Sequence, residues 1–197
     1  MKKLILVTSP PSCGKTYVSK KLAKVLKHVV YLDKDTLIPL SKQIFVAAGE
    51  EYNRSSPFFE QFIRDFEYET VVDLALEALE YDDIVLINAP FSEEIRDKKY
   101  IQNLKNMLKE KNASLVIIWV VATLEVCKQR MIARNSDRDT WKLANWDEYI
   151  AGENFDIPTA LDDPMIIDDL LIFKNSTDKE FNESLGQIVD ILEETTR

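Results

Sequence analysis

The sequence predicts an α/β protein built as a three-layer α/β/α sandwich around a five-stranded parallel sheet. Five short apolar runs alternate with segments whose apolar residues recur at helical spacing. The runs are residues 4–7, 29–32, 84–87, 115–121 and 170–173. Each is apolar throughout, as expected for parallel strands that helices cover on both faces. We therefore expect helices on both sides of the sheet and right-handed crossovers between its strands.

Composition bounds the class of protein. The chain has 197 residues, of which 46% are hydrophobic, enough for one domain with a packed core. A net charge of −9 disfavours a general nucleic-acid binder, and no apolar run is long enough to span a membrane. Two cysteines, Cys13 and Cys127, favour a reducing cytoplasm without a structural disulfide. We expect no nucleic-acid or membrane partner, and composition leaves the oligomeric state open.

The first strand leads into a loop with phosphate-binding chemistry. The loop and the helix start comprise Ser9, Pro10, Pro11, Ser12, Cys13, Gly14, Lys15, Thr16 and Tyr17. The spacing resembles the G-x-x-x-x-G-K-[ST] loop of P-loop nucleotide-binding proteins, with Ser9 in place of the first glycine. Backbone N–H groups and the helix N-terminus would hold the phosphates of ATP. Lys15 would reach the β- and γ-phosphates, and the Thr16 hydroxyl would bind Mg²⁺.

Two alternatives are weighed at this loop. An ordinary strand-to-helix turn could carry Gly-Lys-Thr by chance, but an apolar strand before it and an amphipathic helix after it favour the phosphate site. Ser9 is unstrained only if its φ is negative. Cys13 precedes a helix N-terminus, a position that can lower the pKa of a thiol.

An Asp-Lys-Asp sequence follows the second strand, at the edge of the sheet where ligands bind in open α/β folds. Residues two apart in a strand face the same side, so Asp33 and Asp35 are both expected to point toward the phosphate site. One carboxylate could hold Mg²⁺ and the other could accept a proton from an acceptor hydroxyl. The alternative is a pair of turn-forming or helix-capping aspartates.

With the loop and the Asp-x-Asp pair, the chain resembles the small P-loop kinases that include adenylate, shikimate and gluconate kinases. The resemblance covers nearly the whole chain and implies a P-loop NTPase fold with strand order 2-3-1-4-5. It implies that Asp35 is the base and Asp33 a metal or water ligand, although which of the two is the base stays open. It also implies an acceptor-binding insertion at about residues 36–80 and a lid at about residues 134–160.

The insertion is predicted to be helical. Ser56 and Pro57 indicate the start of a long helix. Its expected core face comprises Phe59, Phe62, Phe66, Thr70, Leu74 and Ala78. Arg54 and Arg64 are candidates for binding an anionic acceptor, as is Arg96 in a helix predicted to begin at Ser92. Solvated surface arginines are the alternative interpretation.

The ends of the third, fourth and fifth strands complete the expected site. Asn88 follows the third strand, where many P-loop proteins place an acidic metal ligand. After the fourth strand, Thr123 caps a helix that carries Arg130 and Arg134, and Arg138 follows. The resemblance makes these three arginines lid residues that neutralise charge on the transferred phosphoryl group; a charged surface paired with Asp137 and Asp139 is the alternative. Lys174, Asn175 and Ser176 follow the fifth strand, where the resemblance places the adenine.

The leading hypothesis is a Mg²⁺- and ATP-dependent phosphotransferase with a small-molecule acceptor. A second hypothesis is a P-loop ATPase or nucleotide-binding switch that signals to a protein partner. A third is a kinase-like toxin or an antibiotic phosphotransferase. A GTPase is disfavoured, because neither Asn-Lys-x-Asp nor Asp-x-x-Gly after the third strand is present.

Overall fold

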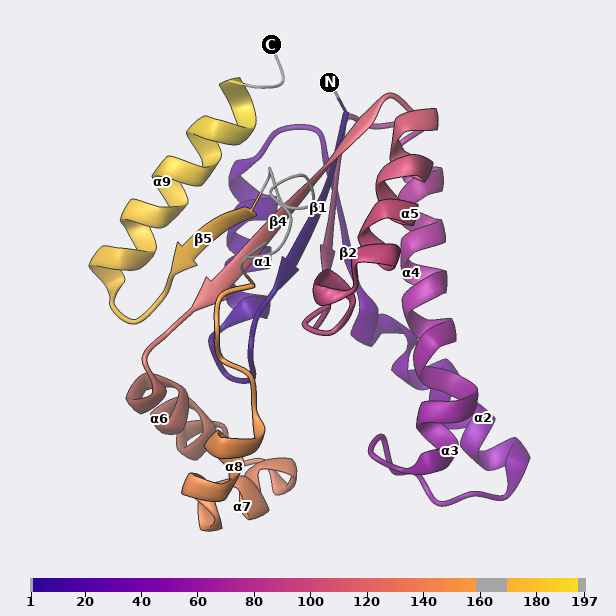
Figure 1. Cartoon of the computed structure of the whole chain (residues 1–197), viewed down its shortest axis with the longest axis vertical. Coiled ribbons are helices and arrows are strands. Elements are labelled where there is room, and N and C mark those ends of the chain that lie inside the picture. The colour runs from indigo at the N-terminus through magenta and orange to yellow at the C-terminus, as the bar shows by residue number, and fades with distance from the viewer. Residues whose placement is uncertain (1, 159–169, 195–197) are drawn as a thin grey trace.

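A computed structural model describes residues 2–158 and 170–194 of the chain (Figure 1). Its centre is a sheet of five strands in which every pairing is parallel. The strands are β1 (Lys2–Thr8), β2 (Val29–Asp33), β3 (Ile84–Asn88), β4 (Ala113–Val121) and β5 (Leu170–Lys174). Their order in space is β2-β3-β1-β4-β5, which confirms the expected topology.

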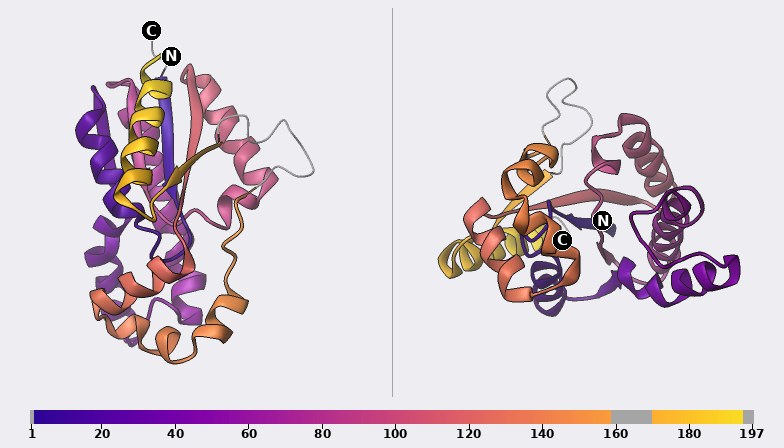
Figure 2. Two further views of the ribbon diagram at one scale, coloured as in Figure 1. Left: turned by 90° about the vertical axis from the view of Figure 1, so that its left-hand side faces the viewer. Right: turned by 90° about the horizontal axis from the view of Figure 1, so that it is seen from below.

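Helices cover both faces of this sheet (Figures 1 and 2). The α-helices are α1 (Lys15–Val25), α2 (Ile38–Ala48), α3 (Pro57–Phe59), α4 (Asp65–Ala78), α5 (Lys98–Glu110), α6 (Leu124–Arg134), α7 (Asp137–Ala144), α8 (Trp146–Gly152) and α9 (Asp178–Glu194). Two 3₁₀ turns, η1 (Lys34–Leu37) and η3 (Glu94–Arg96), and one π-helical turn, η2 (Glu60–Arg64), complete the described elements.

Strand β1 shows why the fold has three layers. Its central side chains are fully buried although they alternate between the two faces of the sheet. Leu4 and Leu6 pack in one cluster with residues of α4 and α5. Ile5 and Val7 pack in the other with residues of α1 and α9. Both faces of the sheet are therefore covered by apolar side chains and shielded from water, and polar groups gather at the ends of the strands.

The long helix α3–η2–α4 buries a different face from the one expected. Phe62, Phe66 and Leu74 are 51%, 61% and 44% exposed. The buried line is Ile63, Glu67, Val71, Ala75 and Leu79, each one position later than expected. The π-helical turn η2 explains the shift, because a π turn inserts one extra residue into a helix and rotates everything after it. Phe59 precedes η2 and is buried as expected.

The helix after β3 also begins later than expected. It begins at Lys98 instead of Ser92, and the intervening residues form the 3₁₀ turn η3. Asp97 caps it by accepting hydrogen bonds from the backbone N–H groups of Lys99 and Tyr100. The expected caps at Ser56 and Thr123 are confirmed.

Two groups of helices extend past the carboxyl ends of the strands (Figure 1). Helices α2 and α3 lie beyond β2, and helices α6, α7 and α8 lie beyond β4. The loop after β1 lies between them. In residues 2–158 and 170–194, no helix combines the length and the apolar character needed to cross a membrane.

Candidate functional site

The loop between β1 and α1 has the backbone that an anion site needs. Ser12 and Gly14 have positive φ values of 63° and 92°, whereas Ser9 is not among the described residues with positive φ. Serine therefore costs little at position 9. Position 14, by contrast, does not tolerate a side chain, since a Cβ there would lie 2.3 Å from Asn175 Nδ2. Backbone geometry and close packing both require glycine at position 14.

Two side chains hold the loop from behind. The carbonyl of Cys13 accepts hydrogen bonds from Asn175 Nδ2 at 2.7 Å and from an Arg130 terminal nitrogen at 2.9 Å. The other terminal nitrogen of Arg130 donates to the Asn175 carbonyl at 2.7 Å. The guanidinium of Arg130 thus joins α6, the loop and the end of β5.

A buried amide links the ends of the first three strands. Asn88, at the end of β3, is 2% exposed. Its Oδ1 accepts a hydrogen bond from Lys15 Nζ at 2.8 Å, and its Nδ2 donates to Asp33 Oδ2 at 2.9 Å and to Thr16 Oγ1 at 3.2 Å. Asn88 pairs in register with Asp33 on one side and with Val7 on the other. Parallel pairing therefore brings these polar groups together.

The charges at this cluster depend on one another. Burial lowers the pKa of Lys15 to about 8, although the nearby Asp35 and Asp33 carboxylates favour its charged form. Burial alone would raise the pKa of Asp33. Hydrogen bonds from the Asn88 amide, the Tyr31 hydroxyl and the Asp35 backbone N–H outweigh burial and lower it. Asp33 therefore stays an anion, and the neighbouring Lys15 ammonium gives up its proton more easily than an ordinary lysine.

Asp35 reaches the site by another route than expected. Asp33 is the last residue of β2, but Asp35 lies in the 3₁₀ turn η1, so strand alternation does not relate the two side chains. Asp33 Oδ1 caps this turn by accepting the Asp35 N–H at 3.1 Å. The Asp35 side chain is 64% exposed and lies 3.5 Å from Lys34 Nζ. The Asp33 carboxylate thus caps the turn, whereas the Asp35 carboxylate is exposed to solvent.

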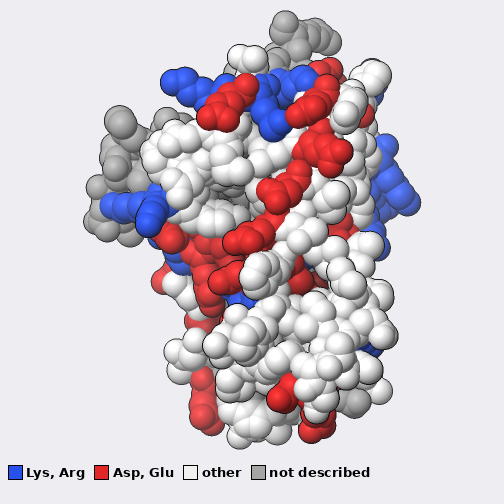
Figure 3. Space-filling view, turned by 90° about the vertical axis from the view of Figure 1, so that its right-hand side faces the viewer, with Lys and Arg blue, Asp and Glu red and all other residues white. Residues whose placement is uncertain are grey.

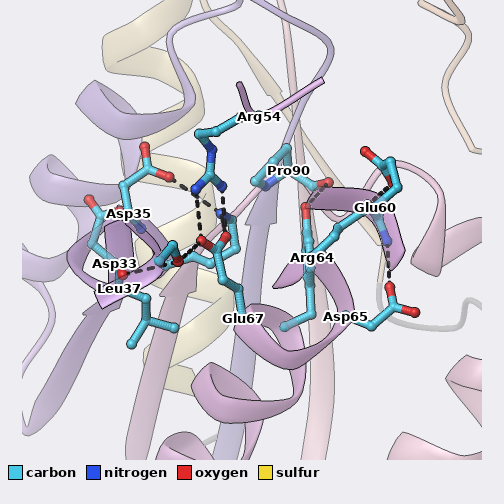
Figure 4. Close-up of polar contacts among 12 residues, drawn as sticks. Asp33, Asp35, Leu37, Arg54, Glu60, Arg64, Asp65, Glu67 and Pro90 are labelled. Atoms are coloured by element: carbon cyan, nitrogen blue, oxygen red, sulfur yellow. Dashed lines mark hydrogen bonds and ion pairs between the residues drawn. The ribbon is translucent and has the colours of Figure 1, made fainter. Parts of the chain in front are cut away.

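Below Asp35, an ion cluster anchors the insertion (Figure 4). Glu67, on α4, is only 4% exposed and receives two hydrogen bonds from Arg54, both 2.7 Å long. It also receives one from Lys34 Nζ at 2.9 Å and one from the Ser41 hydroxyl. Burial alone would raise the pKa of Glu67, but these bonds lower it to about 2. Arg54 is thereby held next to the loop.

The structure does not bring Arg64 and Arg96 to the loop. Arg64 pairs with Glu94 at 2.6 Å and with Glu93 at 3.2 Å, away from Arg54 (Figure 4). It lines a separate groove between α4 and α5, the face on which acidic side chains form a band in Figure 3. Arg96 donates to the Asp156 carbonyl at 2.6 Å, with its guanidinium 5.5 Å from the Trp119 ring centroid.

A cavity of about 540 Å³ opens in front of the loop. It is lined by Ser9, Pro10, Pro11, Ser12, Gly14, Lys15, Thr16, Tyr17, Lys34, Asp35, Arg54, Pro90, Ser92, Arg130, Arg134, Asp139, Lys142 and Glu153. Six lining residues are cationic and three are anionic, although the whole chain carries −9. An excess of positive charge next to backbone N–H groups suits a polyphosphate.

The helices beyond β4 bring further charge to this cavity. Arg134 forms two 2.7 Å hydrogen bonds with the buried Asp139 carboxylate and reaches Ser12 Oγ at 3.3 Å. Asp139 is thus the local ion-pair partner that one reading of the sequence anticipated. Arg138 lies in α7, but its side chain lies outside the described residues.

The remaining sequence-predicted residues flank the loop. Tyr17 lines the cavity, and its ring packs at a tilt of 47° against Phe181 with the centroids 5.2 Å apart. The backbone N–H of Lys174 donates to Ser184 Oγ, and Ser176 Oγ accepts from the Thr123 N–H, so both tie β5 to its neighbours.

Cys13 differs from its expectation. It is not among the residues that line the cavity in front of the loop, and a hydrogen bond with the Cys127 thiol and burial raise its pKa. The positive charge of Arg130 favours the thiolate, but the hydrogen bond with Cys127 and burial outweigh it.

Sequence reasoning missed Lys34, Glu67 and Lys142. Lys34 lies between Asp33 and Asp35, so a lysine at this place in the sequence could have indicated a cation at the sheet edge. Glu67 was missed because the apolar face of its helix was placed one residue out of phase. Lys142 comes to the cavity through the turn between α6 and α7, which no local pattern predicts.

A magnesium ion at this site would need other oxygen ligands besides carboxylates of the protein. Across the part of the chain that the structure describes, no three His, Cys, Asp or Glu side chains form a cluster that could bind a metal by themselves. The Thr16 hydroxyl and the Asp33 carboxylate both contact the Asn88 amide, and they fit a hard cation as oxygen donors.

Comparison with solved structures supports this picture. A protein provisionally described as a kinase from Chloroflexus aurantiacus superposes with a TM-score of 0.64 at 20% identity, covering 98% of this chain and 97% of that one. A gluconokinase from Sinorhizobium meliloti has a TM-score of 0.54 at 12% identity, covering 100% and 98%. Kti12 from Chaetomium thermophilum, in complex with ADP-AlF3, has a TM-score of 0.54 at 18% identity, covering 95% and 97%. These likenesses show a shared P-loop NTPase fold.

Sequence comparison adds the family. A search of curated protein sequences found no match. The family described as the AAA domain matches residues 4–152, which is well over half of the chain and includes the loop, the Asp-Lys-Asp turn and helix α6. With its P-loop geometry, its strand order and this match, the chain belongs to the AAA domain family and is similar to the P-loop small-molecule kinases.

Proposed function

We propose that this protein is a Mg²⁺-dependent kinase that transfers the γ-phosphate of ATP to a hydroxyl group of a small molecule. One observation carries the proposal. A phosphate-type loop with Lys15 and Thr16 shares a single cavity with Asp35 and Arg54, which come from the turn after β2 and from the insertion. A donor site and a polar acceptor site therefore lie side by side at one edge of the sheet.

The donor side follows from the loop. Backbone N–H groups of residues 12–16 and the start of α1 would bind the phosphates. Lys15 would turn its ammonium group from Asn88 to the transferred phosphate. Thr16 and Asp33 would hold Mg²⁺, which supplies positive charge against the phosphate oxygens. Asn88 would keep Asp33 and Thr16 in place for this role.

The acceptor side would use Asp35. The acceptor oxygen attacks the γ-phosphorus, its proton passes to the Asp35 carboxylate, and the bond from the γ-phosphorus to the bridging oxygen breaks so that ADP leaves. The exposed Asp35 side chain faces the cavity from a turn that its neighbour Asp33 caps. Arg54, held by Glu67, would contact the acceptor.

The organisation of the chain follows the same proposal. Residues of about 36–80 would bind the acceptor, and residues of about 134–160 would form a lid that brings Arg134 and Arg138 to the transferred phosphate. Arg64 and Arg96 are left out of the acceptor site, because their described contacts lie elsewhere. A reducing cytoplasm suits the two free thiols of the chain.

The test is MgATP-dependent release of ADP against a panel of acceptors that includes nucleosides, nucleoside monophosphates, sugars, sugar acids, polyols and hydroxyl-bearing antibiotics. We expect one class to raise release well above the rate without acceptor. Lys15→Ala is the blank. Lys20→Ala, an exposed lysine one turn further along α1, is the matched control and should behave as wild type.

A flat panel would contradict the small-molecule proposal. If slow ADP release depends on Lys15 but on no acceptor, the nucleotide-binding switch becomes the better interpretation. If release persists in Lys15→Ala, the assignment of the loop is wrong.

A further inference from the structure

The two cysteines of the chain meet at the phosphate-type loop. Cys13 lies in the loop and Cys127 on the first turns of α6, 114 positions later. Their sulfur atoms are 3.5 Å apart, and both thiols are free. Residue exposure is 1% for Cys13 and 0% for Cys127. The fold therefore holds two reduced thiols in van der Waals contact beside the proposed nucleotide site.

A second cavity gives a small molecule access to this pair. It has a volume of about 610 Å³ and shares Pro10 and Glu153 with the cavity in front of the loop. It is lined by Pro10, Cys13, residues 121–124 and residues 150–156. Cys13 is part of its wall and Cys127 is not. A small oxidant in this cavity would therefore lie next to Cys13.

The two thiols are not equivalent. The hydrogen bond with Cys127, together with burial, raises the pKa of Cys13. The same hydrogen bond, with the nearby positive charge of Arg130, lowers the pKa of Cys127, although burial opposes this. The positive charge of Arg130 thus favours a thiolate at this pair, the form of cysteine that reacts with a peroxide.

We propose that Cys13 and Cys127 are a site of oxidative modification, at which a peroxide converts the two thiols into an intramolecular disulfide that weakens nucleotide binding. Peroxide first transfers one oxygen to the sulfur of one of the two cysteines, giving a sulfenic acid and one water. The other sulfur then attacks the oxidised sulfur and expels hydroxide, which leaves as water with the proton of the attacking thiol. The pair loses two electrons, and one peroxide becomes two waters.

The effect on the loop follows from distances. A disulfide has sulfur atoms about 2.05 Å apart, so the present 3.5 Å contact must shorten by about 1.5 Å. Cys13 has little slack, because Asn175 and Arg130 hold its carbonyl. The next residue, Gly14, packs closely against Asn175. Pulling Cys13 toward α6 therefore displaces the backbone N–H groups that would bind phosphate. This second half of the proposal rests on the proposed nucleotide site.

The experiment measures the two halves separately. Purified full-length protein is treated with excess hydrogen peroxide, denatured, and its free thiols are counted. Intact mass then distinguishes a disulfide, which loses two hydrogens, from added oxygen. In parallel, the affinity for a fluorescent ATP analogue is measured before oxidation, after it, and after dithiothreitol. We expect the thiol count to fall from two to zero, and the affinity to fall at least tenfold and then recover.

Cys127→Ala is the control, with Cys127→Ser as a second variant should the alanine weaken folding. In either variant, Cys13 has no partner thiol and can only gain oxygen. We therefore expect neither the loss of two hydrogens in the intact mass nor a loss of nucleotide affinity that dithiothreitol reverses. If wild type keeps both thiols in excess peroxide, the modification does not occur and the proposal is wrong.

Two further results would separate the parts. A disulfide that leaves affinity unchanged would overturn the effect on the loop. If the reduced protein binds no nucleotide, the proposed function fails, while the thiol count still decides whether the disulfide forms. Bound MgATP should shift the thiol–disulfide equilibrium toward the two thiols, since a modification that weakens binding is itself opposed by the ligand.

Discussion

At the scale of single residues, Asn88 explains how this site differs from the usual P-loop arrangement with an acid at the end of the third strand. Its partner in register is Asp33. A second carboxylate next to Asp33 would repel it, whereas an amide donates to Asp33 and accepts from Lys15 at once. The negative charge of the site is thus carried by Asp33 at the end of β2 instead of by a residue of β3. The Asn88 amide can then bind both Asp33 and Lys15.

The ionisation of Lys15 gives the first prediction. Because burial lowers the pKa of Lys15 to about 8, this side chain loses its charge as the pH rises through 8 in the free protein. ATP affinity should therefore weaken above pH 8, by up to about tenfold per pH unit, and binding should take up protons there. Calorimetry in buffers with different ionisation enthalpies would measure the uptake. Lys15→Arg, which stays charged, should remove the pH dependence; an unchanged slope in this variant would assign it to another group.

Asp35 gives the second prediction. Asp35→Asn keeps the shape of the side chain but cannot take up a proton, so kcat with the identified acceptor should fall by about 10²–10⁴-fold. The affinity for ATP should change little. Asp73→Asn, an exposed residue on α4, is the matched control. Equal losses of turnover and ATP affinity would instead give Asp35 a metal-binding or structural role.

At the scale of elements, the insertion is attached to the sheet by charge as well as by apolar packing. Glu67 of α4 binds Lys34 of η1 and Arg54 in one buried cluster. Removing its buried acid leaves Arg54 and Lys34 with only the exposed Asp35 carboxylate, 3.5 Å from Lys34 Nζ, among the acids described next to them. The position of Arg54 in the cavity therefore depends on a residue of another element that does not line the cavity itself.

Glu67→Gln should lower the free energy of unfolding by about 3–5 kcal/mol at neutral pH. The folded-state pKa of Glu67 is about 2, below its usual 4.5, so its contribution is complete above pH 4.5 and is lost as the pH falls toward 2. The difference between wild type and variant should shrink over that range in urea unfolding curves. Glu69→Gln, exposed on the same helix, should cost less than about 0.5 kcal/mol. A constant difference at all pH values would argue against this cluster.

The π-helical turn gives a prediction at two adjacent positions. Ile63 is 2% exposed and Phe62 is 51% exposed. Ile63→Ala should cost about 2–5 kcal/mol of unfolding free energy, and Phe62→Ala much less. The expectation from regular helical spacing is the reverse. Chemical denaturation of both variants would decide whether η2 sets the phase of the helix.

At the scale of the whole molecule, the fold places cationic side chains from distant segments around one cavity. Lys15, Arg54 and Lys142 come from α1, the insertion and α7, and together with their neighbours they outnumber the acids that line the cavity. The rest of the surface is acidic enough to give the chain its charge of −9. A local positive field in an acidic molecule favours an anionic ligand at this place.

Binding there should stabilise the whole fold. MgATP at about 100 times its Kd should add about 2.7 kcal/mol to the free energy of unfolding, because the unfolded chain has no loop to bind it. Thermal unfolding monitored by calorimetry would show the rise in Tm. Lys15→Ala should remove most of the rise, and a full rise in this variant would place the nucleotide elsewhere.

The architecture was predictable because its signals are local. Five apolar runs, a Gly-Lys-Thr turn and the resemblance to P-loop kinases led to the observed strand order. The helical phase after Phe59 was not predictable, because no sequence pattern announces a π turn whose stability comes from packing on both sides of it. The start of α5 was misplaced because acids after Ser92 resemble a first helical turn, whereas Asp97 makes the cap.

The sequence by itself determined the strands, the loop and the candidates at the strand ends, because each depends on residues close together in the chain. Only the tertiary structure decided which candidates meet. It placed Arg130 against the Cys13 carbonyl, turned Arg64 toward Glu94, and set Glu67 beneath Arg54. Contacts of this kind depend on which strands are neighbours and on how each helix is rotated, and pairing and packing fix both across the whole molecule.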